Sequence, residues 1–261
     1  MPHRIGKNPK RHKTNEELYN AGKKIMMNWE LENSVLIEND NVRENFICGT
    51  DEAGRGPLAG DVYAAAVILP HGLEIDGLFD SKKLSAKKRE KLYDIIIEKA
   101  LAYCIASASI EEIDNLNILN AALLAMKRAV TGLSAEIKPD YVLIDGNIVR
   151  GFDDFKYKGI IKGDSISPNI AAASILAKVA RDRYMRELDE MYPLYHFKRN
   201  KGYPTEEHIF RLKSFGECPA HRKSFLKHIL SEDFQSQVEI EIVGDGVLDV
   251  PHNDKELNYE S

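Results

Sequence analysis

Four acidic residues follow expected strands, and they are the side chains best placed to do chemistry. Asp51 and Glu52 follow one apolar run, Asp145 follows another, and Asp164 follows a third. Carboxylates at strand ends project from the rim of a sheet, where sites usually lie in folds of this kind. Carboxylate oxygens without His or Cys suit Mg²⁺ or Mn²⁺ and not zinc. Two such ions can promote in-line attack of water on a phosphodiester.

A simpler interpretation stands beside this one. Taken singly, Asp145 and Asp164 are typical turn or cap residues, because an Asp beside a Gly is a common turn former. The pair Asp51-Glu52 raises a different difficulty, since adjacent side chains on a strand point to opposite faces. Both could face one site only if the strand ends there and turns, which the nearby glycine allows.

A glycine-flanked arginine comes directly after the acidic pair, at Gly54, Arg55 and Gly56. Glycines let a backbone approach a phosphate closely, and a guanidinium can grip the same group. The string therefore favours a phosphate-bearing ligand.

Apolar runs and helical patterns that must position these residues alternate along the chain. The runs rich in β-branched residues and alanine predict strands at residues 46–50, 62–69, 101–109, 141–144 and 158–161. The apolar spacing predicts helices at residues 15–40, 85–100, 117–130, 167–191 and 204–215. Strands interspersed with helices predict one α/β domain around a single sheet, spanning about residues 44–215.

Two helix starts carry clear local signals. Ser167 is a good N-cap with Pro168 at the first helical position. Ser85 opens the helix to about residue 100. The residues spaced for the buried face of that helix are Leu92, Ile95, Ile96 and Lys99.

Length and composition allow one sizeable domain with extensions, because the chain has 261 residues of which 43% are hydrophobic. No apolar run approaches the roughly 20 residues that cross a bilayer. The polar, basic N-terminus does not look like a secretory signal, so we expect a cytoplasmic protein with no membrane partner. Cys48, Cys104 and Cys218 match no zinc or disulfide spacing, and we assign them no function.

The net charge of −5 is unevenly distributed. Residues 231–261 hold nine Asp or Glu and one Lys, which leaves a balance of +3 for residues 1–230. A mildly basic body suits a nucleic-acid partner, but an ordinary surface with a solvated acidic tail explains the charge equally well.

Beyond these patterns, the string DEAGRGPLAG at residues 51–60 resembles the signature of ribonuclease HII, the bacterial type 2 ribonuclease H. Further strings occur in the order of that family. They are DSKKLS at 80–85, LIDGN at 143–147, KGD at 162–164, AAASILAKVARD at 171–182, NKGYPTEEH at 200–208 and HRKSF at 221–225. The resemblance covers about residues 44–230 and implies a ribonuclease-H-like mixed five-stranded sheet flanked by helices, with a helical C-terminal cap.

The resemblance also implies a role for each matching residue. The four metal-binding and catalytic acids would be Asp51, Glu52, Asp145 and Asp164. The residues that sense the ribose at an RNA-to-DNA junction would be Gly54, Arg55 and Gly56. Tyr203 would stack on the sugar of the following deoxynucleotide, where an aromatic ring disfavours an extra hydroxyl. Lys82 would lie near the scissile phosphate.

The implied enzyme cuts the RNA strand of RNA–DNA hybrids and nicks duplex DNA on the 5′ side of embedded ribonucleotides. It would use two Mg²⁺ or Mn²⁺ ions and act as a monomer. We divide the chain into a basic arm and helical appendage at 1–43, a catalytic domain at 44–230 and an acidic tail at 231–261, in which residues 238–243 could add a strand.

Two other functions stay open at this point. The first is a non-catalytic RNA–DNA duplex-binding protein on the same fold, although the presence of all four acids argues against it. The second is a two-metal nuclease or resolvase that acts on DNA alone, against which Tyr203 and the Gly-Arg-Gly string argue.

Several other polar residues have structural alternatives. Asp182 is expected to form an ion pair within a long helix, and His208 is expected to cap or pack. The charges Lys198, Arg199 and Lys201 are either solvated surface or a phosphate-contact strip beside Tyr203. The same two interpretations apply to Arg222 and Lys223.

Overall fold

Five strands form one mixed sheet, as the alternating sequence pattern predicts. A computed structural model describes residues 29–78 and 84–229 of the chain. The strands are β1 (Ile47–Ala53), β2 (Val62–Ile68), β3 (Ala102–Ala108), β4 (Tyr141–Asp145) and β5 (Tyr157–Ile160). Their order is β3-β2-β1-β4-β5, with β1 and β2 antiparallel, β2 and β3 antiparallel, and β1, β4 and β5 parallel. The expected mixed five-stranded sheet is therefore confirmed.

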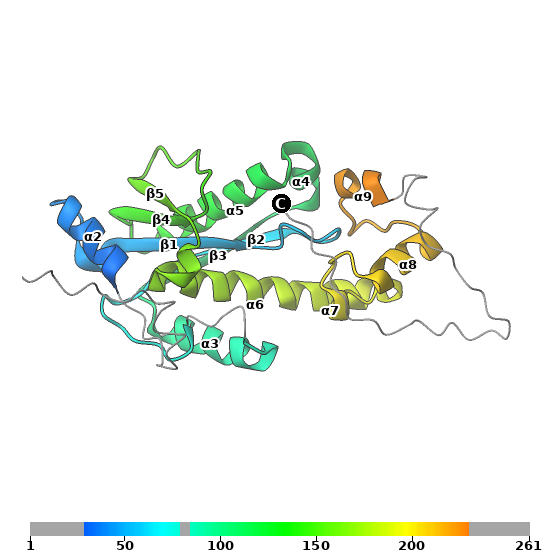
Figure 1. Cartoon of the computed structure of the whole chain (residues 1–261), viewed down its shortest axis with the longest axis horizontal. Helices are drawn as coiled ribbons and strands as arrows, with labels where there is room; N and C mark the ends of the chain where they lie inside the picture. Colours follow the sequence, from blue (N-terminus) through cyan, green and yellow to red (C-terminus); the bar gives the residue numbers. More distant parts are fainter. Residues whose placement is uncertain (1–28, 79–83, 230–261) are drawn as a thin grey trace, which may run out of the picture.

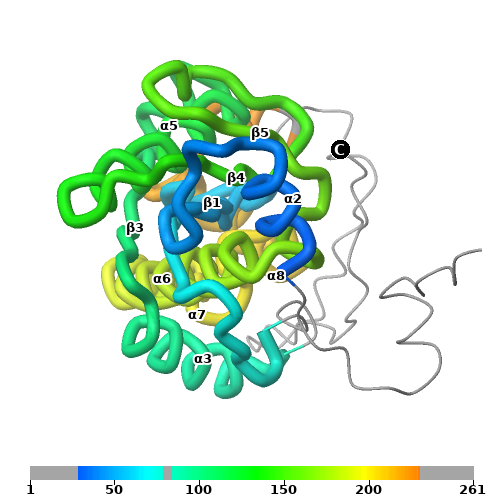
Figure 2. Tube along the Cα trace, turned by 90° about the vertical axis from the view of Figure 1, so that its left-hand side faces the viewer, coloured from blue at the N-terminus to red at the C-terminus, as the bar shows by residue number. Residues whose placement is uncertain are grey.

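Helices cover both faces of this sheet (Figure 1). Helix α5 (Ile118–Leu133) packs on one face, and α6 (Pro168–Met191) with α3 (Ala86–Lys99) packs on the other. The end-on view separates the two layers (Figure 2). Alternate residues of β2 serve the two cores, with Ala64 and Ala66 against α5 and Ala65 and Val67 against α6. This period of two is what a strand buried on both faces requires.

Small residues let α6 lie very close to the sheet. Ala171, Ala172 and Ala173 are fully buried in its first half. A side chain at Gly49 of β1 would collide with the backbone at Asn169 and Ile170. The close approach brings the start of α6 beside the central strand, where the expected acidic site lies.

The predicted helix starts agree with the structure. The Ser167 side chain accepts a hydrogen bond from the backbone N–H of Ile170, and Pro168 is the first residue of α6. Ser85 caps α3 through the N–H of Lys88. Lys99, which was predicted on the buried face of α3, is exposed instead. A lysine in the last turn reaches solvent and the helix C-terminus.

A helix that the sequence analysis did not predict precedes α5. Helix α4 (Ile110–Leu116) begins with a capping box, in which Ser109 and Glu112 satisfy each other's backbone N–H groups. Asn117 then adopts a φ of 69° and caps α5. The expected single helix at residues 117–130 is thus the second of two, and it extends to Leu133.

The described N-terminal part holds helix α2 (Glu30–Glu38) and a 3₁₀ turn, η1 (Glu44–Phe46). Trp29 and Val35 are buried, so this segment packs against the domain. The rest of the predicted helix at residues 15–40 lies outside the described residues.

Short helices close one end of the molecule and form the expected C-terminal cap (Figure 1). They are η4 (Pro193–Tyr195), α7 (Phe197–Asn200), α8 (Glu206–Phe215) and α9 (Lys223–Ile229). Thr205 caps α8, close to the predicted start. The acidic tail and its possible strand at residues 238–243 lie outside the described residues, and the domain boundaries at 43/44 and 230/231 stay predictions. No helix among the described residues is both long and apolar enough to span a bilayer.

Candidate active site

Asp51 and Glu52 lie inside β1, not at its end. The strand runs on to Ala53, and Asp51 and Glu52 stand opposite Ala65 and Ala64 of β2. The expectation that the strand ends before the acidic pair is therefore wrong. The parallel neighbour stops instead: its pairing with β1 ends at Thr50 and Ile144. Both acids thus lie beside the end of β4.

The next residue of β4 is Asp145, and its charge reaches both acids of β1. Asp51 is only 6% exposed. Burial raises its pKa well above the ordinary value, and the negative charges of Glu52 and Asp145 add to that rise. Burial also raises the pKa of Glu52, opposed by Arg55 and assisted by Asp145. The three carboxylates therefore share one electrostatic environment.

Asp164 reaches the same region through a tight turn. Lys162 has a φ of 54°, and the 3₁₀ turn η3 (Gly163–Ser165) follows it. The backbone N–H of Gly163 donates to Asp145 Oδ1 at 2.6 Å. A Cβ at Gly163 would lie 3.2 Å from that oxygen, so glycine permits this close approach. Asp164 itself is buried, one residue from the contact.

The donor set suits a hard divalent cation, but its present geometry does not form a finished cage. Within residues 29–78 and 84–229, no three His, Cys, Asp or Glu side chains are grouped so as to hold a metal ion. Asp51 accepts a 2.7 Å hydrogen bond from the N–H of Glu52, and a Glu52 oxygen lies 3.4 Å from Arg55. The carboxylates are thus engaged with protein donors, and their chemistry is that of a magnesium or manganese site.

The Gly-Arg-Gly string forms an exposed turn beside the acids. Gly54 has a φ of +102°, a conformation that favours glycine. Arg55 and Gly56 are exposed, whereas Gly54 and Pro57 are buried.

Tyr203 lies against this turn although it is far away in the sequence. A Cβ placed on Gly56 would lie 3.5 Å from the Tyr203 ring. The N–H of Leu58 donates to the carbonyl of Gly202 at 2.7 Å, which ties the two segments together. Tyr203 is 41% exposed, so its ring is available to a ligand.

The positive residues near Tyr203 differ in exposure, and their role as a phosphate-contact strip or as solvated surface stays a prediction. Lys198 and Arg199 are exposed, and Arg199 lies 3.5 Å from the Glu207 carboxylate. Lys201 is half-buried, and burial lowers its pKa. Of the residues expected near the substrate, Lys82 lies outside the described part of the chain.

Arg222 corrects a prediction. It was expected at the surface, as a phosphate contact or solvated charge, yet it is fully buried and donates to backbone carbonyls of the turn at residues 54–60. Lys223 next to it is exposed. Arg181, also fully buried, donates to the carbonyls of Ala59 and Asp61 in the same loop. Sequence reasoning missed both arginines, since charged side chains are almost never fully buried.

Two further expectations are confirmed. Asp182 forms an ion pair in α6, with Lys178 one turn earlier at 2.8 Å and not with the neighbouring arginines. His208 is buried and packs, with its ring bonded to the Tyr203 carbonyl and to His221. The sequence analysis did not identify the partner His221.

Helices on both faces of a mixed five-stranded sheet, with acidic side chains at its central strands β1 and β4, define a ribonuclease-H-like fold. The crystal structure of the ribonuclease H2 from Pyrococcus horikoshii has this fold. It superposes with a TM-score of 0.55 at 24% identity, covering 73% of this chain and 95% of that one.

The particular family follows from the sequence. The family model for ribonuclease HII matches residues 48–228. The ribonuclease HII of Caldicellulosiruptor bescii is 52% identical over 204 residues, covering 77% of this chain and 98% of the relative. That of Burkholderia cenocepacia is 54% identical over 182 residues, covering 70% and 84%. The chain belongs to the ribonuclease HII family and is a ribonuclease H, an endonuclease of RNA–DNA hybrids whose family implies a divalent metal ion.

Proposed function

We propose that the protein hydrolyses the RNA strand of hybrids and nicks duplex DNA on the 5′ side of embedded ribonucleotides, using Asp51, Glu52, Asp145 and Asp164 to hold two Mg²⁺ or Mn²⁺ ions. The main support is the meeting of β1 and β4, where Asp145 raises the pKa of both Asp51 and Glu52. Such ions supply activation of the attacking water and stabilisation of the leaving 3′ oxygen, and the products are a 3′-hydroxyl and a 5′-phosphate.

The carboxylates themselves must rearrange to take this role. Repulsion and burial make the negative charge of Asp51 and Glu52 costly, so each gains from a nearby cation. Glu52, which now contacts Arg55, and Asp145, which now accepts from Gly163, would both contribute oxygens to hold the ions.

Recognition of ribose is proposed for the turn Gly54-Arg55-Gly56 and for Tyr203. Their support is the contact between Gly56 and the Tyr203 ring, which places a backbone turn and an exposed aromatic face side by side. Backbone groups at a glycine can test a 2′-hydroxyl at close range. The ring can stack on the next sugar, where an added hydroxyl would fit poorly. The role of Lys82 rests on the family resemblance.

We also propose that the protein acts as a monomer in the cytoplasm, with nucleic acid as its partner. The support for a monomer is that β1, β4, η3 and the Tyr203 segment all come from one chain. A second copy is not needed to complete the site.

The test is cleavage of a labelled DNA duplex that carries one ribonucleotide, with Mg²⁺, Mn²⁺ or EDTA. We expect a metal-dependent nick 5′ to the ribonucleotide, abolished by Asp145→Asn. Asp140→Asn is the matched control, because Asp140 lies just before the other end of β4 and pairs with Arg43 at 2.8 Å. Cleavage of an all-DNA duplex would contradict the proposed ribose recognition. A folded protein that cuts long hybrids but never the single-ribonucleotide duplex would limit the function to hybrids.

A further inference from the structure

The turn at residues 54–60 rests on a buried guanidinium. Arg222 donates to the carbonyls of Gly54 at 2.7 Å, Arg55 at 3.1 Å, Pro57 at 2.7 Å and Gly60 at 2.8 Å. The backbone N–H of Arg222 donates to the carbonyl of Leu58 at 2.8 Å. Because Arg222 is fully buried, the carbonyls that face it point into the protein.

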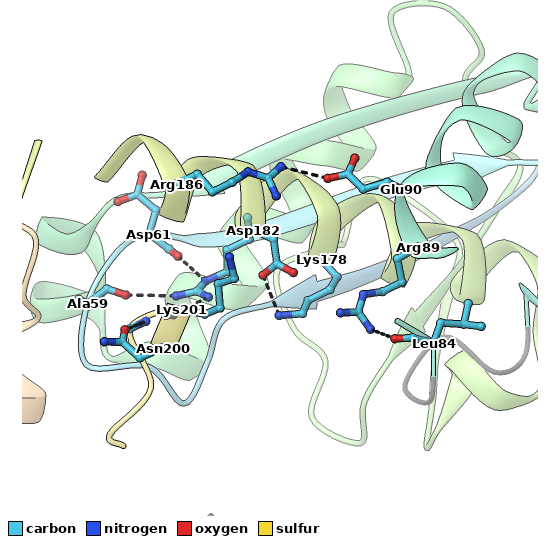
Figure 3. A network of polar contacts seen from close by, with 12 residues as sticks. Ala59, Asp61, Leu84, Arg89, Glu90, Lys178, Asp182, Arg186, Asn200 and Lys201 are labelled. Atoms are coloured by element: carbon cyan, nitrogen blue, oxygen red, sulfur yellow. Dashed lines mark hydrogen bonds and ion pairs between the residues drawn. The ribbon is translucent and has the colours of Figure 1, made fainter. Parts of the chain in front are cut away.

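A second buried guanidinium continues the same arrangement. Arg181 donates to the carbonyls of Ala59 at 3.1 Å, Asp61 at 3.3 Å and Lys201 at 3.1 Å. Figure 3 shows Ala59, Asp61 and Lys201 gathered around this point beside α6. Arg181 also fills the space beside Gly54, where any side chain would collide with it. Arg181 therefore fixes both flanks of the turn and the segment before Tyr203.

Neither arginine is neutralised by an ion pair among the described residues. Carbonyl dipoles solvate the two charges instead. Burial, together with the positive charge of Arg181, lowers the pKa of Arg222 to about 9. Two buried cations side by side are costly to keep. Apolar side chains of similar size would fill the same space but would leave the buried carbonyls without donors, so packing alone does not account for the two arginines.

The direction of the carbonyls fixes the direction of the N–H groups. A trans peptide is planar, with its C=O and N–H pointing opposite ways, and no described peptide bond is cis. The inward carbonyl of Gly54 thus sends the N–H of Arg55 outward, and the inward carbonyl of Arg55 sends the N–H of Gly56 outward. Both residues are exposed, as outward N–H groups require.

We propose that Arg222 and Arg181 are positioning residues for substrate selection. Arg222 holds the carbonyls of Gly54 and Arg55 inward, so that the N–H groups of Arg55 and Gly56 face the ribonucleotide, and Arg181 supports the turn from its contact beside Gly54 and its bond to Ala59. The inference rests on the proposed ribose recognition at this turn. Neither arginine touches the substrate. A lysine cannot replace either one, because a single ammonium lacks the planar fork that spans several carbonyls.

The first test compares two substrates with one enzyme preparation. We measure kcat/KM on a duplex with a single ribonucleotide and on a uniform RNA–DNA hybrid. The ratio does not depend on the folded fraction, so a merely structural role would not move it. Arg222→Lys should lower this ratio at least about tenfold, because a single ribonucleotide allows one productive register whereas the hybrid allows many. Arg128→Lys is the matched control, since Arg128 also donates to a carbonyl, that of Ser107, but on the α5 face.

A ratio within about twofold of wild type in Arg222→Lys would overturn the inference. If that variant does not fold, Arg181→Lys is judged by the same criterion.

A second measurement needs no variant. Amide hydrogen exchange of the wild type in EDTA should show protection of Arg55 and Gly56 by the single-ribonucleotide duplex beyond that given by an all-DNA duplex. Equal protection would overturn both the proposed ribose recognition by this turn and the inference that rests on it. A wild type that gives the expected protection but fails to nick would count against the proposed cleavage only.

Discussion

Asp51 holds a carboxylate in a nearly buried position between two other acids, and this arrangement serves binding at the expense of stability. A group whose folded pKa is raised makes the folded state less favourable as pH rises above its ordinary value, because the unfolded chain releases the proton more easily. At neutral pH the Asp51 carboxyl therefore makes the metal-free fold less stable.

We expect Asp51→Asn to stabilise the metal-free protein at neutral pH by about 0.5–2 kcal/mol while abolishing cleavage. The amide oxygen can still accept from the N–H of Glu52, so the exchange removes charge and keeps shape. Urea unfolding in EDTA measures the effect. Added Mg²⁺ should then stabilise the wild type and leave the variant unchanged. A less stable variant in EDTA would contradict this account of the acids.

A buried histidine pair lies at the same scale on the C-terminal side. The N–H of Cys218 donates to His221 Nδ1 at 2.9 Å, so neutral His221 carries its proton on Nε2 and donates to His208 at 3.1 Å. His208 in turn donates to the carbonyl of Tyr203 at 2.9 Å. Burial lowers the pKa of both rings, that of His221 to about 4. The relay therefore works with both rings neutral.

The low pKa of His221 makes the stability of the folded chain depend on pH. The unfolded chain takes up a proton near pH 6.5 and the folded His221 only near pH 4, so stability falls as pH falls through this window. From about pH 7 to about pH 5 we expect a loss of about 2 kcal/mol from this residue. His221→Gln keeps a donor toward His208 but cannot titrate. The variant should be less stable than the wild type at neutral pH and should lose less stability on acidification. Urea unfolding at both pH values measures the free energy of unfolding of each protein. An equal loss of stability in both proteins would exclude the histidine pair as its source.

At the scale of elements, the sequence predicted the features that depend only on neighbouring residues. The apolar run of β2 and the Ser167-Pro168 start of α6 are visible in the sequence, and the structure has both. Helix α4 was missed although Ser109 and Glu112 carry its capping box, because seven residues are too short for a clear helical period. Whether Asp51 and Glu52 lie beside the end of β4 depends on which of the two strands ends first. Only the register between β1 and β4 decides that.

The same limit explains Arg222. Its neighbours His221 and Lys223 give no signal that the side chain is buried. The segment crosses over the turn at residues 54–60, and an isolated bridge joins Ala59 to His221 there. Contacts between segments so far apart depend on the whole fold and leave no periodic trace in the sequence.

The turn after β1 allows a prediction that separates backbone strain from contact. Gly54 and Gly72 have φ values of +102° and +78°. A Cβ at Gly54 would collide with Arg181, whereas a Cβ at Gly72 would meet nothing within 4 Å. We expect Gly72→Ala to lower the free energy of unfolding by about 1 kcal/mol from backbone strain alone. Gly54→Ala should cost more and weaken binding of the single-ribonucleotide duplex in EDTA. Urea unfolding and a binding titration measure both effects, and equal costs at the two sites would show that the contact with Arg181 is unimportant.

At the scale of the whole molecule, the sequence places opposite charge on the body and on the tail. Residues 1–230 carry a balance of +3, and residues 231–261 carry −8. A nucleic acid is a dense line of phosphates, so an acidic segment tethered to the same molecule opposes its approach by long-range repulsion and competes for basic residues. Salt screens this repulsion over about 10 Å at 0.1 M.

Removing residues 231–261 should therefore tighten binding of an RNA–DNA hybrid in EDTA, by about tenfold near 50 mM salt, and the gain should shrink as salt rises. The matched control keeps the full length and replaces the nine acids of the tail with Gln and Asn, which removes the charge but not the chain. Both proteins should give the same titration curves if charge is the cause. Tighter binding by the shortened chain alone would assign the effect to the bulk of the tail, and no change in either would show that its charge does not reach the bound duplex.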